Sequence, residues 1–97
     1  LMKVYYEMNE YDPFFSLVDA FKIYLRRNKF ISDFQRDTYH NFILLLNKMM
    51  KVKLGKNEMT INLHKEILST KPAADLAWLK SKSQELLIKA KLEDPEA

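Results

Sequence analysis

The residues best suited to chemistry are two histidines, His40 and His64, because imidazole binds zinc and exchanges protons near neutral pH. The segment His64-Lys65-Glu66 lacks a second ligand at the i+4 spacing that a helical zinc site needs. The chain has no cysteine, which excludes thiolate metal sites and cysteine nucleophiles, and its single glycine, Gly55, excludes a glycine-rich phosphate loop. We interpret both histidines as surface or edge residues.

Carboxylates and hydroxyls also lack a catalytic pattern. Asp33 and Asp37 share a helical face at i, i+4, but no Glu-x-x-His pair accompanies them as in metal-binding bundles. We interpret them as solvated residues near a helix start, where the helix dipole favours negative charge. No His–acid pair stands out beside the serines. The sequence therefore predicts a protein that is not an enzyme and that has no catalytic residues, no metal site and no cofactor.

Composition favours one small helical domain. The chain has 97 residues, of which 47% are apolar and 12% aromatic, enough to build a core. One glycine and three prolines are few for a sheet with tight turns, so we expect an all-α fold. The longest apolar run, residues 42–46, is far below the roughly 20 residues of a membrane helix, so no membrane span is expected. The lack of cysteine and of a visible secretory signal predicts a cytoplasmic location.

Two long helices are predicted in the first half of the chain. Asp12-Pro13 is typical of a helix start, because Asp caps free N–H groups and Pro at the first position loses no hydrogen bond. After a break near Asn28, a capping box of Ser32 and Gln35 opens a helix over 33–54, which Gly55 should end in a left-handed conformation. Apolar stripes follow helical spacing in both: Phe14, Leu17, Val18, Phe21, Tyr24 and Leu25, then Tyr39, Phe42, Ile43, Leu46, Met49 and Met50.

The rest of the chain is predicted as shorter helical pieces. Residues 1–9 are interpreted as a truncated helix, and Asn57 as the cap of a helix carrying Met59, Leu63 and Ile67. Residues 69–72 should end that helix, because a proline disfavours helix at the preceding residue. We predict one domain over 1–92, a frayed tail over 93–97, and about five helices with antiparallel neighbours. The last helix has Leu76, Leu79, Leu86 and Ala90 on one side.

The beginning of the chain resembles the late part of a tetratricopeptide repeat. Tyr5 and Tyr6 would close helix A, Asn9-Glu10 would form the turn, and Tyr11 would precede helix B. The chain departs from the motif at helix B, where Phe14 and Phe21 replace small residues and Val18 replaces a large aromatic one. Nearly the whole chain, including residues 24–29, 39–43 and 70–79, is similar to the C-terminal region of uncharacterised repeat proteins from Bacteroidetes bacteria. The resemblance implies the end of a longer α-solenoid.

A protein-interaction or scaffold module is the function that this resemblance favours. The predicted binding site is a groove between the first two helices, where aromatic area and a cation that grips a carboxylate would come together: Tyr6, Tyr11, Phe15, Lys22 and Arg26. The partner would be a protein or peptide. The alternative is a purely structural cap of the solenoid. Trp78 is interpreted as an anchor between the last helices, and Tyr5, Tyr24 and Tyr39 as core residues.

Two further hypotheses follow from charge and truncation. Basic residues gather near two helix ends, at 26–29 and at 48–56, which would suit phosphate or nucleic acid if both clusters formed one face. In an antiparallel pair these ends lie apart, and cations near helix C-termini also favour the helix dipole, so nucleic acid is the weaker hypothesis. If residues 1–9 are half of a helix pair, the first two helices would expose an apolar face and form a homodimer.

Overall fold

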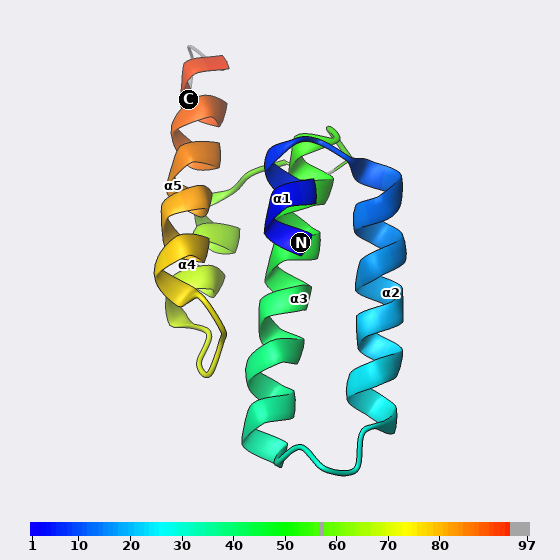
Figure 1. Ribbon diagram of the computed structural model, residues 1–97. Coiled ribbons are helices and arrows are strands. Elements are labelled where there is room, and N and C mark those ends of the chain that lie inside the picture. Colours follow the sequence, from blue (N-terminus) through cyan, green and yellow to red (C-terminus); the bar gives the residue numbers. More distant parts are fainter. Residues whose placement is uncertain (57, 94–97) are drawn as a thin grey trace.

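The protein is a small bundle of α-helices, in agreement with the predicted all-α fold. The computed structural model describes residues 1–56 and 58–93, and for residue 93 only the backbone. The described residues form five helices, of which the second, third and fifth are long (Figure 1). Their bounds are α1 (Met2–Glu7), α2 (Tyr11–Arg27), α3 (Asp33–Lys53), α4 (Ile61–Ser69) and α5 (Leu76–Glu93).

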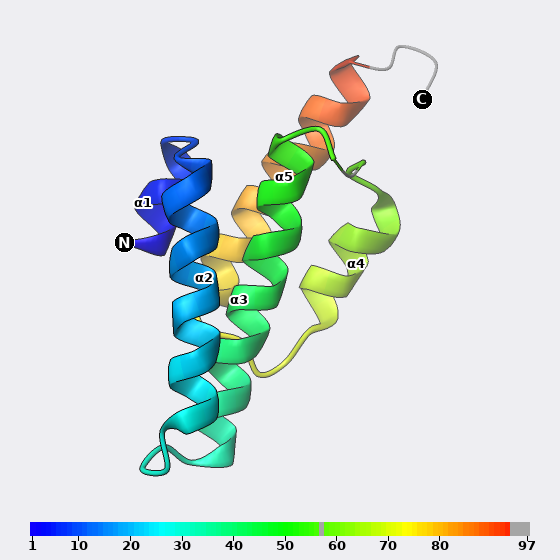
Figure 2. The same ribbon diagram turned by 90° about the vertical axis from the view of Figure 1, so that its right-hand side faces the viewer.

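Consecutive helices run in opposite directions, as the short links predict. In Figure 1, α2 descends and α3 ascends beside it, and α1 leads upward into the turn before α2. The chain then descends through α4 and ascends through α5, which packs on both α3 and α4. Figures 1 and 2 both show that the second half of α5 projects past the end of α3. Residues of this part of α5 line a recess together with the upper end of the bundle, and its lining is described below.

The core is centred on α3, which contacts α2 on one side and α5 on the other. Six side chains of α3 are buried, more than any other described helix contributes, because this long helix lies between α2 and α5 and packs on both. Trp78 is half-buried and packs its ring edge-on against Tyr6, with centroids 5.6 Å apart, and near Phe42. It is an anchor, but it joins α5 to α1 and α3 rather than fastening the last two helices together. The buried residues of α3 are Phe42, Ile43, Leu45, Leu46, Met49 and Met50.

Both predicted caps of α3 are confirmed. The amide of Gln35 donates to Oγ of Ser32 at 3.1 Å, and the Gln35 side chain accepts from the amide of Ser32 at 3.2 Å. At the other end Gly55 has φ +77°, and the amides of Gly55 and Lys56 donate to the carbonyls of Val52 and Lys51. This is a Schellman ending, which satisfies carbonyls that the last turn leaves without a helical partner.

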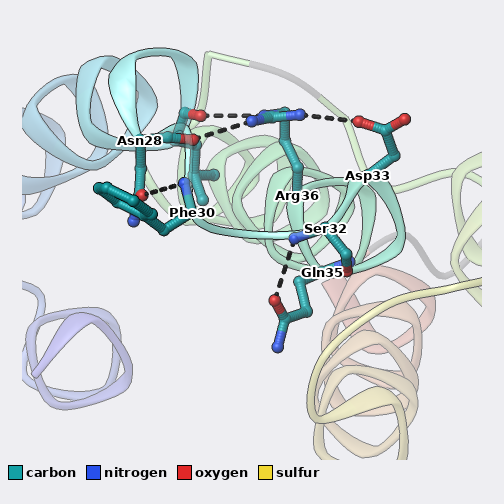
Figure 3. Close-up of polar contacts among 7 residues, drawn as sticks. Asn28, Phe30, Ser32, Asp33, Gln35 and Arg36 are labelled. Carbon is teal, nitrogen blue, oxygen red and sulfur yellow. Dashed lines mark hydrogen bonds and ion pairs between the residues drawn. The ribbon is translucent and has the colours of Figure 1, made fainter.

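A polar cluster fixes the loop between α2 and α3 (Figure 3). The guanidinium of Arg36 donates to the carbonyls of Leu25 and Asn28, at 3.0 and 2.9 Å, and pairs with Asp33 at 3.0 Å. Oδ1 of Asn28 accepts from the amide of Phe30 at 2.9 Å. Arg36 therefore satisfies carbonyls at the end of α2 from a side chain on α3.

Two predicted helix starts are wrong by a few residues. Helix α2 begins at Tyr11, with Glu10 as the N-cap, so Pro13 lies inside the first turn and Asp12 makes no cap. The first-turn amides have no helical acceptor, so a proline here also loses no bond. Helix α4 begins at Ile61 and is capped by Thr60, whose hydroxyl accepts from Leu63 at 3.0 Å. Asn57, the predicted cap, lies outside the described residues.

Two of the tyrosines predicted as core residues are exposed. Tyr24 and Tyr39 are 53% and 44% exposed, and each packs one ring face or edge against half-buried Phe21 at the margin of the core. A tyrosine at the border of an apolar stripe keeps its hydroxyl in water while its ring covers a neighbour. Met59 is buried although it precedes α4 instead of lying on it. Helix α5 reaches residue 93, one residue into the predicted tail, and residues 94–97 lie outside the described part.

Contacts from three directions hold the short helix α1. Lys3 pairs with Asp75 at 3.0 Å, Glu7 pairs with Lys82 at 2.5 Å, and Lys53 donates to the carbonyl of Tyr6. These contacts join α1 to the start of α5, to its middle and to the end of α3, which places Tyr6 beside the recess. Among the described residues, no helix is both long and apolar enough to cross a bilayer.

Candidate functional site

An open cleft of about 970 Å³ lies between the second half of α5 and the upper end of the bundle, and we call it the α5 cleft. Its walls come from the junction of α1 and α2, the end of α3, the residues before α4, and α5. Helix α5 extends past the end of α3 at this end of the bundle (Figure 2). The lining residues are Tyr6, Glu7, Asn9, Tyr11, Val52, Lys53, Gly55, Glu58, Met59, Ile61, Lys82, Glu85, Leu86, Leu87, Lys89, Ala90 and Lys91.

Part of the lining is apolar and aromatic. Met59 is buried, and Tyr11 and Leu86 are half-buried against the core. Tyr6 is only 3% exposed, and this burial, followed by the charges of Glu7 and Glu85, raises the pKa of its hydroxyl well above the ordinary value. The hydroxyl of Tyr6 therefore stays protonated and uncharged at physiological pH, and Tyr6 forms part of the floor of the cleft.

Lysines and glutamates form the rest of the lining. Nζ of Lys53 lies 4.0 Å from the centre of the Tyr6 ring, and burial lowers the pKa of Lys53. Lys82 pairs with Glu7 at 2.5 Å and with Glu85 at 3.4 Å, and the hydrogen bond to Glu7 raises the pKa of Lys82. Four lysines face three glutamates in this lining, so both a cationic and an anionic group of a ligand can find a counter-charge here.

The structure separates the five residues of the predicted groove. Tyr6 and Tyr11 both line the α5 cleft, but Tyr6 belongs to the core instead of offering free aromatic area. Phe15 is half-buried and packs edge-on against Phe14, outside the cleft. Lys22 lies further along α2, and Arg26 is exposed in its last turn, at the opposite end of the bundle. The predicted arrangement of aromatic residues with these two cations is therefore absent from the described residues.

The two basic clusters do not form one face. The residues at the end of α2 and those at the end of α3 lie at opposite ends of the antiparallel pair in Figure 1. With 1.5 Å of rise per residue, the length of α3 separates them by roughly 30 Å. A single phosphate group therefore cannot contact both clusters at once.

His64 and Ser83 form a contact that the sequence analysis did not anticipate. Nδ1 of His64 lies 2.6 Å from Oγ of Ser83, and the bond joins α4 to α5. Ser83 is completely buried, so no substrate can reach its hydroxyl, and no described carboxylate is hydrogen-bonded to His64. The pair is a part-buried polar link between two helices. Within the described residues, no three potential metal ligands of the His, Cys, Asp and Glu types come together.

Sequence reasoning missed Lys53, Lys82, Glu85 and Leu86 as parts of one site. One signal was available in α5, where Lys82, Glu85, Leu86 and Lys89 follow the i, i+3, i+4, i+7 spacing of one helical face. The contribution of Lys53 had no such signal, since it depends on how the end of α3 meets α1.

Comparisons of the chain with protein-family models, with curated proteins and with solved structures found no match. The geometry and charge of the α5 cleft are therefore the basis for assigning a function.

Proposed function

We propose that the chain is a non-enzymatic protein-interaction module that binds a segment of another protein in the α5 cleft. The observation that carries this proposal is the cleft itself, which combines apolar area with charged walls formed by the helices of the bundle. A helical or extended segment fits this setting, because the side of α5 that lines the cleft is a groove wall of the kind that binds amphipathic helices. A cytoplasmic location is part of the proposal.

The chemistry of the cleft predicts the character of the bound segment. Apolar side chains of the ligand would cover Met59 and Leu86, and a carboxylate would lie near Lys53 and Lys91. Lys53 is a favourable partner for an anion because burial disfavours its charged form, which lowers its pKa, and a nearby carboxylate would stabilise that form. We therefore expect peptides with one or two large apolar residues next to Asp or Glu.

A peptide library displayed on phage, followed by affinity measurement on the selected peptides, tests the proposal. Leu87 lines the cleft, whereas its neighbour Ile88 is 49% exposed outside it, so Leu87→Glu and Ile88→Glu are a matched pair on one helix. We expect Leu87→Glu to weaken binding by roughly tenfold or more and Ile88→Glu to leave it nearly unchanged. Failure to select any peptide, or an equal loss in both variants, would rule the cleft out as the binding site.

A structural cap in a tetratricopeptide-like array is the second candidate function. It is supported by exposed apolar side chains in and beside α1, namely Leu1, Val4 and Met8, which are 72%, 50% and 65% exposed. A neighbouring repeat, or a second copy of this chain, would cover them. Light scattering at increasing protein concentration tests whether a second copy of this chain covers them. We expect a homodimer that Val4→Lys disrupts. A monomer at all concentrations would remove the homodimer.

A further inference from the structure

The loop between α2 and α3 presents a fully exposed aromatic side chain at one end of the molecule. Phe30 is 99% exposed, and Phe34 in the first turn of α3 is 68% exposed. In Figure 1 this loop is the lowest part of the molecule, at the opposite end from the last turn of α3 and the second half of α5, whose residues line the α5 cleft. We call residues 26–34 the hairpin tip. An isolated exposed apolar residue is ordinary, but two phenylalanines within one short loop and helix start form an apolar point.

The hairpin tip is held in one conformation. The amide of Phe30 donates to Asn28, and Arg36 binds the carbonyl of Asn28 from α3 (Figure 3). The capping box of Ser32 and Gln35 fixes the following residues. A loop that is already ordered loses little conformational entropy when it binds, so exposure of Phe30 is a stable feature that a binding surface can use.

The hairpin tip also carries three cations. Arg26, Arg27 and Lys29 are all exposed, and none of them has an ion pair with a described carboxylate. The nearby Asp33 is already paired with Arg36. The hairpin tip therefore combines unneutralised positive charge with a protruding phenyl ring.

We propose that the hairpin tip is a membrane-contact site that inserts Phe30 into the interface of an anionic lipid bilayer. The three cations would lie at the level of the headgroups, where anionic lipids attract Lys and Arg, while the phenyl ring enters the apolar boundary below. A protruding ring suits a fluid, deformable surface, which needs no preformed pocket. The contact is peripheral, and it uses the end of the molecule opposite the α5 cleft.

Co-sedimentation with lipid vesicles tests the proposal, using phosphatidylcholine vesicles with and without phosphatidylserine. We expect binding only with phosphatidylserine, a loss of roughly tenfold for Phe30→Ala, and of about fivefold for Arg27→Gln. Leu92 is 79% exposed and Lys56 is exposed, both far from the tip, so Leu92→Ala and Lys56→Gln are the controls and should bind like wild type. Phe30→Trp should give a blue-shifted emission with these vesicles.

Three results would overturn the proposal. The first is no binding of the wild type to phosphatidylserine vesicles at low salt. The second is an equal effect of Phe30→Ala and Leu92→Ala. The third is binding to soluble polyglutamate or an oligonucleotide that matches vesicle binding and does not need Phe30, which would assign the tip to acidic macromolecules. Leu87→Glu, in the α5 cleft, should leave vesicle binding intact, which separates this test from that of the proposed peptide site.

Discussion

Replacement of Arg36 by alanine should open the connection between α2 and α3 and destabilise the whole domain. The guanidinium makes two hydrogen bonds to main-chain carbonyls, those of Leu25 and Asn28, and one ion pair with Asp33. The carbonyls lie in the last turn of α2 and at its C-cap, where no helical amide can reach them. Alanine would leave both without a protein partner.

The magnitude follows from the exposure of each contact. A hydrogen bond to a charged group contributes about 1.5–3 kcal/mol when it is well shielded. The Arg36 side chain is 32% exposed, so water replaces part of each bond, and about 1 kcal/mol per carbonyl is the expected loss. Asp33 is 97% exposed, so its ion pair adds little. We expect about 2 kcal/mol in total, which lowers Tm by roughly 8–16 °C for a domain of this size.

Urea unfolding followed by far-ultraviolet circular dichroism measures this loss directly. Arg36→Lys keeps a positive charge near the carbonyls but lacks the several N–H donors of the guanidinium. Its loss of unfolding free energy should therefore be about half that of Arg36→Ala. Asp33→Asn removes only the exposed ion pair and should cost about 0.5 kcal/mol or less. The reasoning fails if Arg36→Ala is as stable as wild type, or if Asp33→Asn is equally harmful.

Three other substitutions test separate features of the fold. Ile67→Ala should lower the free energy of unfolding in urea by about 2–5 kcal/mol, because the Ile67 side chain is completely buried. The neighbouring Leu68 is 41% exposed, so Leu68→Ala is the control. Gly55→Ala should cost about 1 kcal/mol by the same assay, because φ is +77° and no atom lies within 4 Å of the added Cβ, so only the backbone is strained. The raised pKa of Tyr6 means that the unfolded chain loses this proton first, so unfolding free energy should fall as pH rises above 10.0. Tyr6→Phe should reduce that fall in a pH series, and an unchanged slope would contradict the assigned pKa shift.

The sequence was sufficient where structure depends on neighbouring residues. The capping box of Ser32 and Gln35 and the left-handed Gly55 were both predictable, because each cap is completed within a few residues of chain. The apolar stripes located α2 and α3 for the same reason. Pro13 was misleading only in detail, since a proline fits anywhere in the first turn, and the pattern cannot tell which position it takes.

The candidate site was not predictable, because it depends on contacts between distant parts of the chain. Lys53 lies 47 residues from the Tyr6 carbonyl that it binds, and no local pattern relates the two. The contact of His64 with Ser83 likewise requires α4 and α5 to fold back on each other. A groove between the first two helices was a reasonable expectation from the resemblance. In the structure Tyr6 is buried in the core, and the open cleft is lined largely by α5.

The two proposed sites should act independently, and the reason lies in the antiparallel arrangement of α2 and α3. This arrangement places the hairpin tip at one end of a molecule whose longest dimension is 50 Å, and the α5 cleft at the other. At physiological ionic strength, charges separated by more than about 8 Å are largely screened, so occupation of one site changes little at the other. A membrane-bound molecule would therefore keep its cleft directed away from the lipid and free for a protein segment. Peptide affinity should be the same with and without phosphatidylserine vesicles, and a large difference would show that the two ends are coupled.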